Sequence, residues 1–203
     1  MILDISPLRK NRDYRLLYIG QLVSALGSMI TYVAVPEQIW QLTHSSFSVG
    51  LLYAVQLVPL LLFALWGGAY ADSMDRRKLL VISEAFLAVG TLVLAVNTLL
   101  PRPSVTLIFA VSGVMSALNG FHRPALDALT PRLVDREDLR AVSALGSLRY
   151  SVSAIAGPAV GGVLISQIGT VSTYGVDCLT YIISIIALAA IRKMPAPEGQ
   201  KAG

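Results

Sequence analysis

The chain has 203 residues, of which 55% are hydrophobic and 14% charged, with a mean hydropathy of +0.67 and a formal net charge of +4. Soluble domains carry about 25% charged residues, so this composition excludes an ordinary soluble domain and predicts a protein of the lipid bilayer. The modest positive charge also argues against a nucleic-acid partner, which would need a basic face with base-stacking groups.

Six apolar segments are each long enough to form a transmembrane helix, since crossing about 30 Å of hydrocarbon takes about 20 residues. In chain order, the expected helices are residues 16–40, 48–71, 79–99, 105–127, 141–165 and 172–191. Short connectors rich in Gly, Pro, Ser and charged residues separate them. We therefore predict an all-α integral membrane fold. Its parts are an N-terminal segment over 1–15, a six-helix bundle over 16–191 and a linker over 192–203.

The basic residues predict how the helices are oriented. Lys and Arg are retained on the cytoplasmic side of membranes, and here they gather before the first helix and in alternate connectors. Only Arg102 lies in a connector on the opposite side. We therefore expect a multi-pass cell-membrane protein with both termini in the cytoplasm. A secretory signal peptide is the alternative for the N-terminus, but the first apolar run is too long and has no convincing cleavage site.

Three of the predicted helices carry polar side chains along one face. Because positions i, i+3, i+4 and i+7 lie together on a helix, such stripes mark faces turned away from lipid. The stripes comprise Gln21, Ser24, Ser28, Thr31, Tyr32 and Gln38 in the first helix; Ser112, Ser116, Asn119, Arg123 and Asp127 in the fourth; and Thr173, Tyr174, Asp177, Thr180, Tyr181 and Ser184 in the sixth. We expect them to line a path for a small-molecule substrate and for protons.

Ionisable residues at membrane depth are costly, which makes them functional candidates. Asp177, on a polar stripe, is the preferred proton-coupling residue. Glu37 is the second candidate, with contact to the outer headgroups as its alternative role. Arg123 and Arg149 either reach the cytoplasmic interface or contact an anionic substrate, and both interpretations stay open. Glu84 is interpreted as an interfacial charge near the start of the third helix.

The connector between the second and third helices has a characteristic spacing. It reads Gly68-Gly-Ala-Tyr-Ala-Asp72-Ser-Met-Asp75-Arg76-Arg77-Lys78. This Gly-x3-Asp-x2-Asp-Arg-Arg-Lys pattern resembles the signature loop between helices 2 and 3 of the major facilitator superfamily of secondary transporters. It departs from the common family pattern at Ser73, where a basic residue is frequent, and at Asp75, where glycine is common. A plain positive-inside turn would explain the charges alone.

The resemblance implies a conformational role for this loop. Gly68 would let a neighbouring backbone approach closely, and Asp72 would accept hydrogen bonds from a helix N-terminus in a second half of the transporter. The basic residues 76–78 would hold the loop in the cytoplasm, and one of them would pair with Asp127. These contacts would form when the cavity opens outward and break when it opens inward.

A second motif, Gly157-Pro158-Ala-Val-Gly161-Gly162, lies in the fifth helix. It resembles the Gly-Pro-x2-Gly-Gly core of a motif associated with exporters of the superfamily, although Ala144 and Ser153 replace the upstream glycines. Proline would bend the helix there, and the glycines would let another helix pack at the bend. The wider likeness, to siderophore and drug exporters, runs through nearly all 203 residues. It implies half of a major facilitator fold, with an inverted 3+3 repeat.

These observations predict a proton-coupled exporter of a small organic molecule, such as a siderophore or drug, that works by alternating access. An enzyme is not expected: no Gly-x-Ser-Gly context supports an intramembrane serine protease, and no phosphate-binding loop supports ATP use. No cofactor or metal is expected either, because the single Cys178 and the distant His44 and His122 lack ligand spacing.

A second six-helix half is the expected partner of this bundle. It would lie in the same chain, on a separately encoded chain or on a second copy of this one. A non-transporting remnant or membrane scaffold remains the alternative function.

Overall fold

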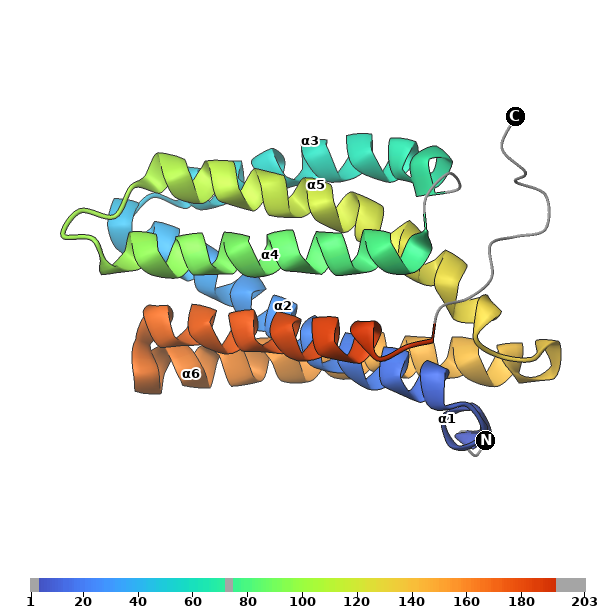
Figure 1. The fold of residues 1–203 in the computed structure, drawn as a ribbon. Helices are drawn as coiled ribbons and strands as arrows, with labels where there is room; N and C mark the ends of the chain where they lie inside the picture. Colours follow the sequence, from blue (N-terminus) through green and yellow to red (C-terminus); the bar gives the residue numbers. More distant parts are fainter. Residues whose placement is uncertain (1–3, 72–74, 193–203) are drawn as a thin grey trace.

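The computed structural model describes residues 4–71 and 75–192, and for residues 66–71 it describes the backbone alone. The helices in chain order are α1 (Ser6–Lys10), α2 (Arg12–Thr43), α3 (Ser46–Ala71), α4 (Arg76–Leu99), α5 (Val105–Leu129), the short η1 (Thr130–Arg132) and η2 (Arg136–Asp138), and α6 (Leu139–Ala189). The long helices lie side by side in one bundle (Figure 1). No strand occurs in the described residues, which confirms the all-α fold class.

The longest helix, α6, supplies two membrane-crossing arms. Its 51 residues would extend about 76 Å if straight, more than twice the thickness of the hydrocarbon core. The chain reverses at Gly169, whose φ of 78° and ψ of 168° fall in a region that essentially only glycine adopts. The first arm (139–168) and the second arm (170–189) run back along each other (Figure 1). The expected connector over 169–172 therefore shrinks to one residue.

Five helices of the described chain are long and apolar enough to cross a membrane. The reversal at Gly169 divides α6 into two arms of sufficient length, which agrees with the six expected spans. The helices extend beyond the expected limits at some ends; α2, for example, begins at Arg12, inside the predicted N-terminal segment 1–15. Asn11 caps α2 because its side chain accepts hydrogen bonds from the backbone of Asp13 and Tyr14. The predicted linker lies outside the described residues apart from Arg192.

The helices pack in a definite order. α2 packs against α6, α6 against α4, α4 against α5 and α5 against α3. α3 is the least buried of the long helices and packs mainly on α5, where Gly120 leaves room for its backbone. A Cβ atom at Gly120 would lie 2.9 Å from the backbone nitrogen of Ala64. The bundle therefore has α3 at one edge and α6 at the opposite one, and α2 packs mainly against α6 (Figure 1).

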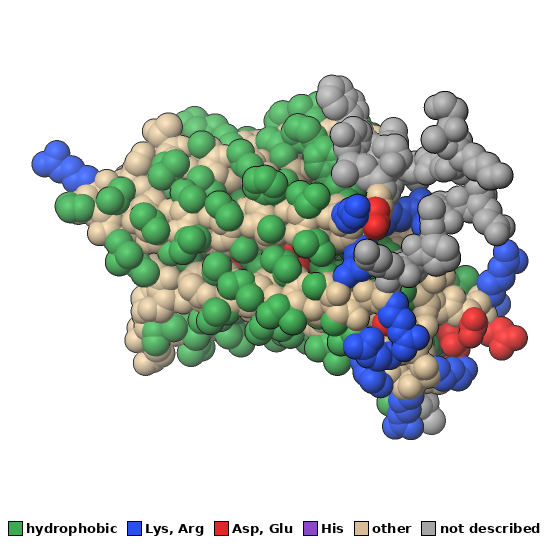
Figure 2. Space-filling model, in the orientation of Figure 1, with side chains coloured by type: hydrophobic (Ala, Val, Ile, Leu, Met, Phe, Trp, Pro, Cys, Tyr) green, Lys and Arg blue, Asp and Glu red, His purple; other side chains and the backbone are tan. Residues whose placement is uncertain are grey.

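The charges separate the two ends of the bundle. The start of α2, the start of α4, the connector after α5 and the end of α6 lie at one end, which we call the basic end (Figure 1). Lys and Arg side chains gather there, while hydrophobic side chains cover the middle of the visible face (Figure 2). Lys10 pairs with Asp138 at 3.3 Å, and the Asn11 side chain donates to the carbonyl of Leu133, so the N-terminal segment is tied to the connector before α6.

Candidate transport site

A seam of polar side chains runs between α2 and the second arm of α6. We define the polar seam as Gln21, Ser24, Ser28, Thr31 and Gln38 of α2 with Tyr174, Asp177, Tyr181 and Ser184 of α6. The structure places both stripes inside the bundle, with all of these side chains buried except the half-buried Ser28. Tyr32 is the exception to the predicted stripe, because it is 52% exposed. The seam is thus a polar layer inside an otherwise apolar bundle.

Asp177 lies in the middle of the polar seam and is completely buried. Thr31 donates its hydroxyl to Oδ2 of Asp177 at 2.5 Å, and Thr180 donates to Oδ1 at 3.1 Å. Within residues 4–71 and 75–192, no Lys, Arg or His forms an ion pair with this carboxyl group. Its partners are neutral hydroxyl groups, so the carboxyl group is held in place without a fixed counter-charge.

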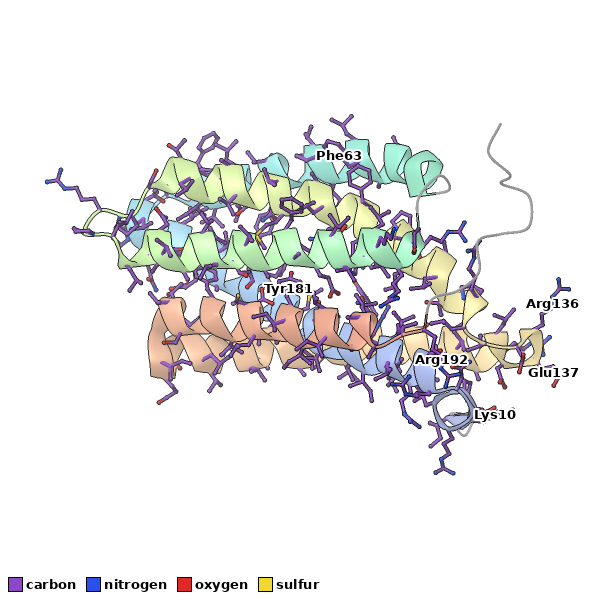
Figure 3. All side chains as sticks on the ribbon, viewed as in Figure 1. Lys10, Phe63, Arg136, Glu137, Tyr181 and Arg192 are labelled. Carbon is purple, nitrogen blue, oxygen red and sulfur yellow. The ribbon has the colours of Figure 1, made fainter. Side chains whose placement is uncertain are left out.

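The other seam residues continue this network toward both ends of the bundle. Tyr181 lies between α4 and α6 (Figure 3), and its hydroxyl is 2.9 Å from that of Ser28. Gln38 accepts a hydrogen bond from the Tyr174 hydroxyl at 2.8 Å and donates to Thr98 of α4, also at 2.8 Å. The polar seam therefore joins α2, α4 and α6 by side-chain hydrogen bonds.

Toward the basic end, Gln21 contacts a carboxyl group that the sequence interpretation misplaced. Glu84 of α4 is fully buried, not interfacial: its Oε1 accepts from Gln21 at 2.6 Å and from Ser184 at 2.9 Å. His122 of α5 lies 3.3 Å from the same oxygen. The prediction of an interfacial Glu84 was wrong because it used the distance of this residue from the start of the helix. It did not consider which side of the helix the residue occupies.

The helical phase of α4 could have identified Glu84. The buried positions of this helix recur with a helical period around it: Leu80, Ser83, Glu84, Leu87 and Thr91. No comparable signal existed for His122, whose distance from His44 argued only against a metal site. It lies on α5 beside the predicted stripe, whose members Asn119 and Arg123 do not join the polar seam. Asn119 donates to the Met115 carbonyl one turn back in its own helix.

Glycine residues bring α2 close to both arms of α6. A Cβ atom at Gly27 would overlap the Thr180 hydroxyl and the Asp177 carboxyl, and one at Gly157 would overlap the Met29 side chain. At Gly161 it would lie 3.2 Å from Cα of Ile30. These close approaches allow tight helix packing in lipid.

Two glycines of the fifth-helix motif lie at this packing contact. Gly157 and Gly161 face α2, whereas Gly162 has open space around it. Pro158 lies inside α6, and Gly169 alone in this helix has non-helical φ and ψ. The predicted bend at Pro158 thus involves no helix break.

The predicted conformational loop is described in part. Asp72 lies outside the described residues, and Gly68 belongs to the backbone-only end of α3. Asp75 caps α4, since its side chain accepts from the backbone of Arg77 and Lys78. The Lys78 side chain is exposed.

The arginines of this loop bind helix ends. Arg77 donates to the carbonyls of Leu188 at 2.7 Å and Ala189 at 2.6 Å, at the end of α6. Arg76 reaches the Ala128 carbonyl at 3.5 Å. Because the last carbonyls of a helix have no partner within it, these guanidinium groups stabilise two helix ends.

A cavity of about 620 Å³ opens at the basic end, between α2, α5 and the first arm of α6. Its lining includes the exposed Asp127 and two guanidinium groups, those of Arg123 and Arg149. Arg123 lies over the ring of Tyr150, 5.6 Å from its centroid, which is a cation–π geometry. The cavity therefore combines positive charge with aromatic surface.

A smaller pocket of about 420 Å³ lies toward the opposite end, between α2 and α3. Glu37 lines it beside three aromatic residues, Tyr32, Trp40 and Tyr53. The Glu37 carboxyl accepts a hydrogen bond from Gln41 at 2.9 Å. Glu37 thus faces a separate pocket and does not belong to the polar seam.

Comparison with known families decides what kind of protein has this bundle. A family model described as "Transmembrane secretion effector" matches residues 3–200. The chain belongs to this family of the major facilitator superfamily. It is therefore a multi-pass membrane protein of a transporter family, as the connector motif had indicated.

Individual relatives agree with this family. The chain is 29% identical to the enterobactin exporter EntS of Salmonella choleraesuis strain SC-B67 and to that of Citrobacter koseri, and 28% identical to that of Escherichia coli O1:K1. Each match extends over 200 residues, which is 97% of this chain and 47% of the relative. The chain thus spans about half the length of the curated relatives it matches.

Proposed function

We propose that this bundle is the N-terminal half of a proton-coupled exporter of a small organic molecule, such as a siderophore or a drug. Alternating access would arise from rocking against a second six-helix half, which opens a central site first to one side and then to the other. The family and the enterobactin exporters among its relatives support the substrate class. Because the chain matches only 47% of the length of those relatives, we infer that transport needs a second half.

The buried carboxyl group of Asp177 carries this proposal. A charged side chain at the centre of a helix in the bilayer costs about 3 kcal/mol on insertion scales, so a neutral, protonated form is favoured unless a partner compensates. Thr31 and Thr180 orient the carboxyl group but bring no charge. Asp177 is therefore suited to bind a proton in one state of the transport cycle and to release it in another.

The cavity at the basic end is the proposed route by which substrate reaches the polar seam. It is bounded by α2 and α5, and its guanidinium groups attract anions or the π-face of an aromatic molecule. In this role Arg123 contacts substrate, while Gln21, Tyr181 and Gln38 form the polar wall deeper in the bundle. Glu37, in the pocket at the other end, would contact substrate on its way out.

The loop between α3 and α4 is the proposed conformational latch. Arg77 already links the start of α4 to the end of α6, so a force on the loop is transmitted to the helix that carries Asp177. Asp72 would complete the latch by contacting the second half, as the family motif implies.

Transport in proteoliposomes tests the proposed function. With the second half present, we expect an inside-acid proton gradient to drive uptake of enterobactin or ethidium, and a protonophore to abolish it. The chain alone should show no accumulation because one bundle has no opposite wall. Accumulation by the chain alone would mean that two copies form both halves. Its absence with both halves present would favour a membrane scaffold.

Both termini and the basic end are proposed to face the cytoplasm. The chain has one cysteine, the half-buried Cys178, so a Cys178→Ala background allows single-cysteine labelling. We expect a membrane-impermeant maleimide to label Arg102→Cys in intact cells, and to label Glu137→Cys only after permeabilisation. The reverse pattern would overturn the orientation.

A further inference from the structure

A second buried carboxyl group, that of Glu84, lies at the point where four helices meet. Gln21 of α2, His122 of α5 and Ser184 of α6 all contact its Oε1, at 2.6, 3.3 and 2.9 Å. The residue itself is 0% exposed. The proposed transport mechanism assigns no role to Glu84 or His122, although a buried ionisable group in a membrane protein usually has a role.

The two oxygens of Glu84 have very different surroundings. Oε1 has three neighbours, whereas the equally buried Oε2 has no hydrogen-bond partner in the described part of the chain. An ionised carboxylate would leave Oε2 with negative charge and no donor, which is costly away from water. A proton on the carboxyl group removes that charge.

Few other titratable groups face Glu84. α5 contributes His122, α6 contributes Tyr181, and the contact from α2 is the neutral Gln21. Among the ion pairs between described residues, the one that includes Glu84 is with His122. The side chain of His122 is 12% exposed and that of Glu84 is 0% exposed. The histidine is therefore the member of the pair that is accessible from outside the bundle.

We propose that Glu84 and His122 together form a proton-binding site, separate from Asp177. A proton arrives on His122 and passes from its Nε2 to Oε1 of Glu84, the carboxyl oxygen 3.3 Å away. One N–H bond breaks and one O–H bond forms, so an imidazolium and a carboxylate become a neutral imidazole and a carboxylic acid. The reverse step releases the proton. Ser184, which contacts Glu84, lies two helical turns from Asp177 on α6, or about 10 Å away. The two sites therefore lie at different depths of the bundle.

This site deepens the proposed function, and its use in transport rests on that function, but proton binding itself can be tested on the chain alone. The measurement is infrared difference spectroscopy of the chain in lipid nanodiscs as the pH is lowered. We expect a carbonyl band of a protonated carboxyl group that is lost in Glu84→Gln. It should persist in Asp177→Asn and in the exposed control Glu137→Gln.

The variants separate proton binding from a merely structural role. Gln at position 84 keeps an acceptor for Gln21, Ser184 and His122, so we expect a thermal unfolding midpoint close to that of the wild type together with loss of the band. Should Glu84→Gln not fold, His122→Gln leaves the carboxyl group in place and must still change the position or the amplitude of the band. A band that is unaltered in both variants, or lost in Asp177→Asn alone, overturns the proposal. Neither result depends on transport.

Discussion

Replacing Asp177 by Asn is expected to abolish proton-driven accumulation of substrate, to the level of liposomes without protein, while exchange of substrate across the membrane continues. Asn has nearly the same shape and retains an oxygen that accepts from Thr31 or Thr180. It cannot bind or release a proton in the transport cycle. Exchange moves no net proton, so it should survive.

This prediction is measured with both halves in proteoliposomes, as gradient-driven uptake and as exchange of labelled for unlabelled substrate. Glu137→Gln, an exposed carboxyl change in η2, is the matched control and should retain both activities. Full gradient-driven accumulation by Asp177→Asn would remove Asp177 from the proton pathway. Loss of exchange as well would indicate a role in substrate binding or in folding.

Replacing Gly27 by Ala is expected to destabilise the bundle, because the added methyl group would overlap both Asp177 and Thr180. Either α2 and the second arm of α6 move apart, or the two side chains leave their present hydrogen bonds. Overpacking of this kind costs about 1–3 kcal/mol of unfolding free energy. Because the Asp177 carboxyl group is displaced, proton-driven transport should fall as well.

Thermal unfolding of the purified chain in detergent checks this result. Gly162→Ala is the matched control: it lies in α6, where nothing is found within 4 Å of the added Cβ atom. Alanine is also the better helix former by about 1 kcal/mol, so the control should be unchanged or slightly more stable. Equal unfolding midpoints for the two variants would contradict the close approach of α2 to α6 at Gly27.

Some of the candidate site followed from the sequence because it depends on one helix at a time. The stripes that contain Gln21 and Asp177 follow from the helical spacing of polar residues in the sequence. A polar face is unfavourable against lipid, so each helix turns that face toward the interior of the bundle. The sequence did not predict which side chain each of these polar residues contacts. Thr31 and Asp177 meet because two separate stripes face each other at a height set by Gly27.

The sequence by itself determined the number of membrane crossings, the basic end and the family. Each of these depends on local properties: the length of an apolar run against the bilayer thickness, the placement of Lys and Arg, and the spacing of a short motif. Only the tertiary structure decided that Glu84 is buried beside His122 and that Arg77 binds the end of α6. Those outcomes depend on the rotation of each helix about its axis and on which neighbour it meets, and both are set by packing between segments far apart in the chain.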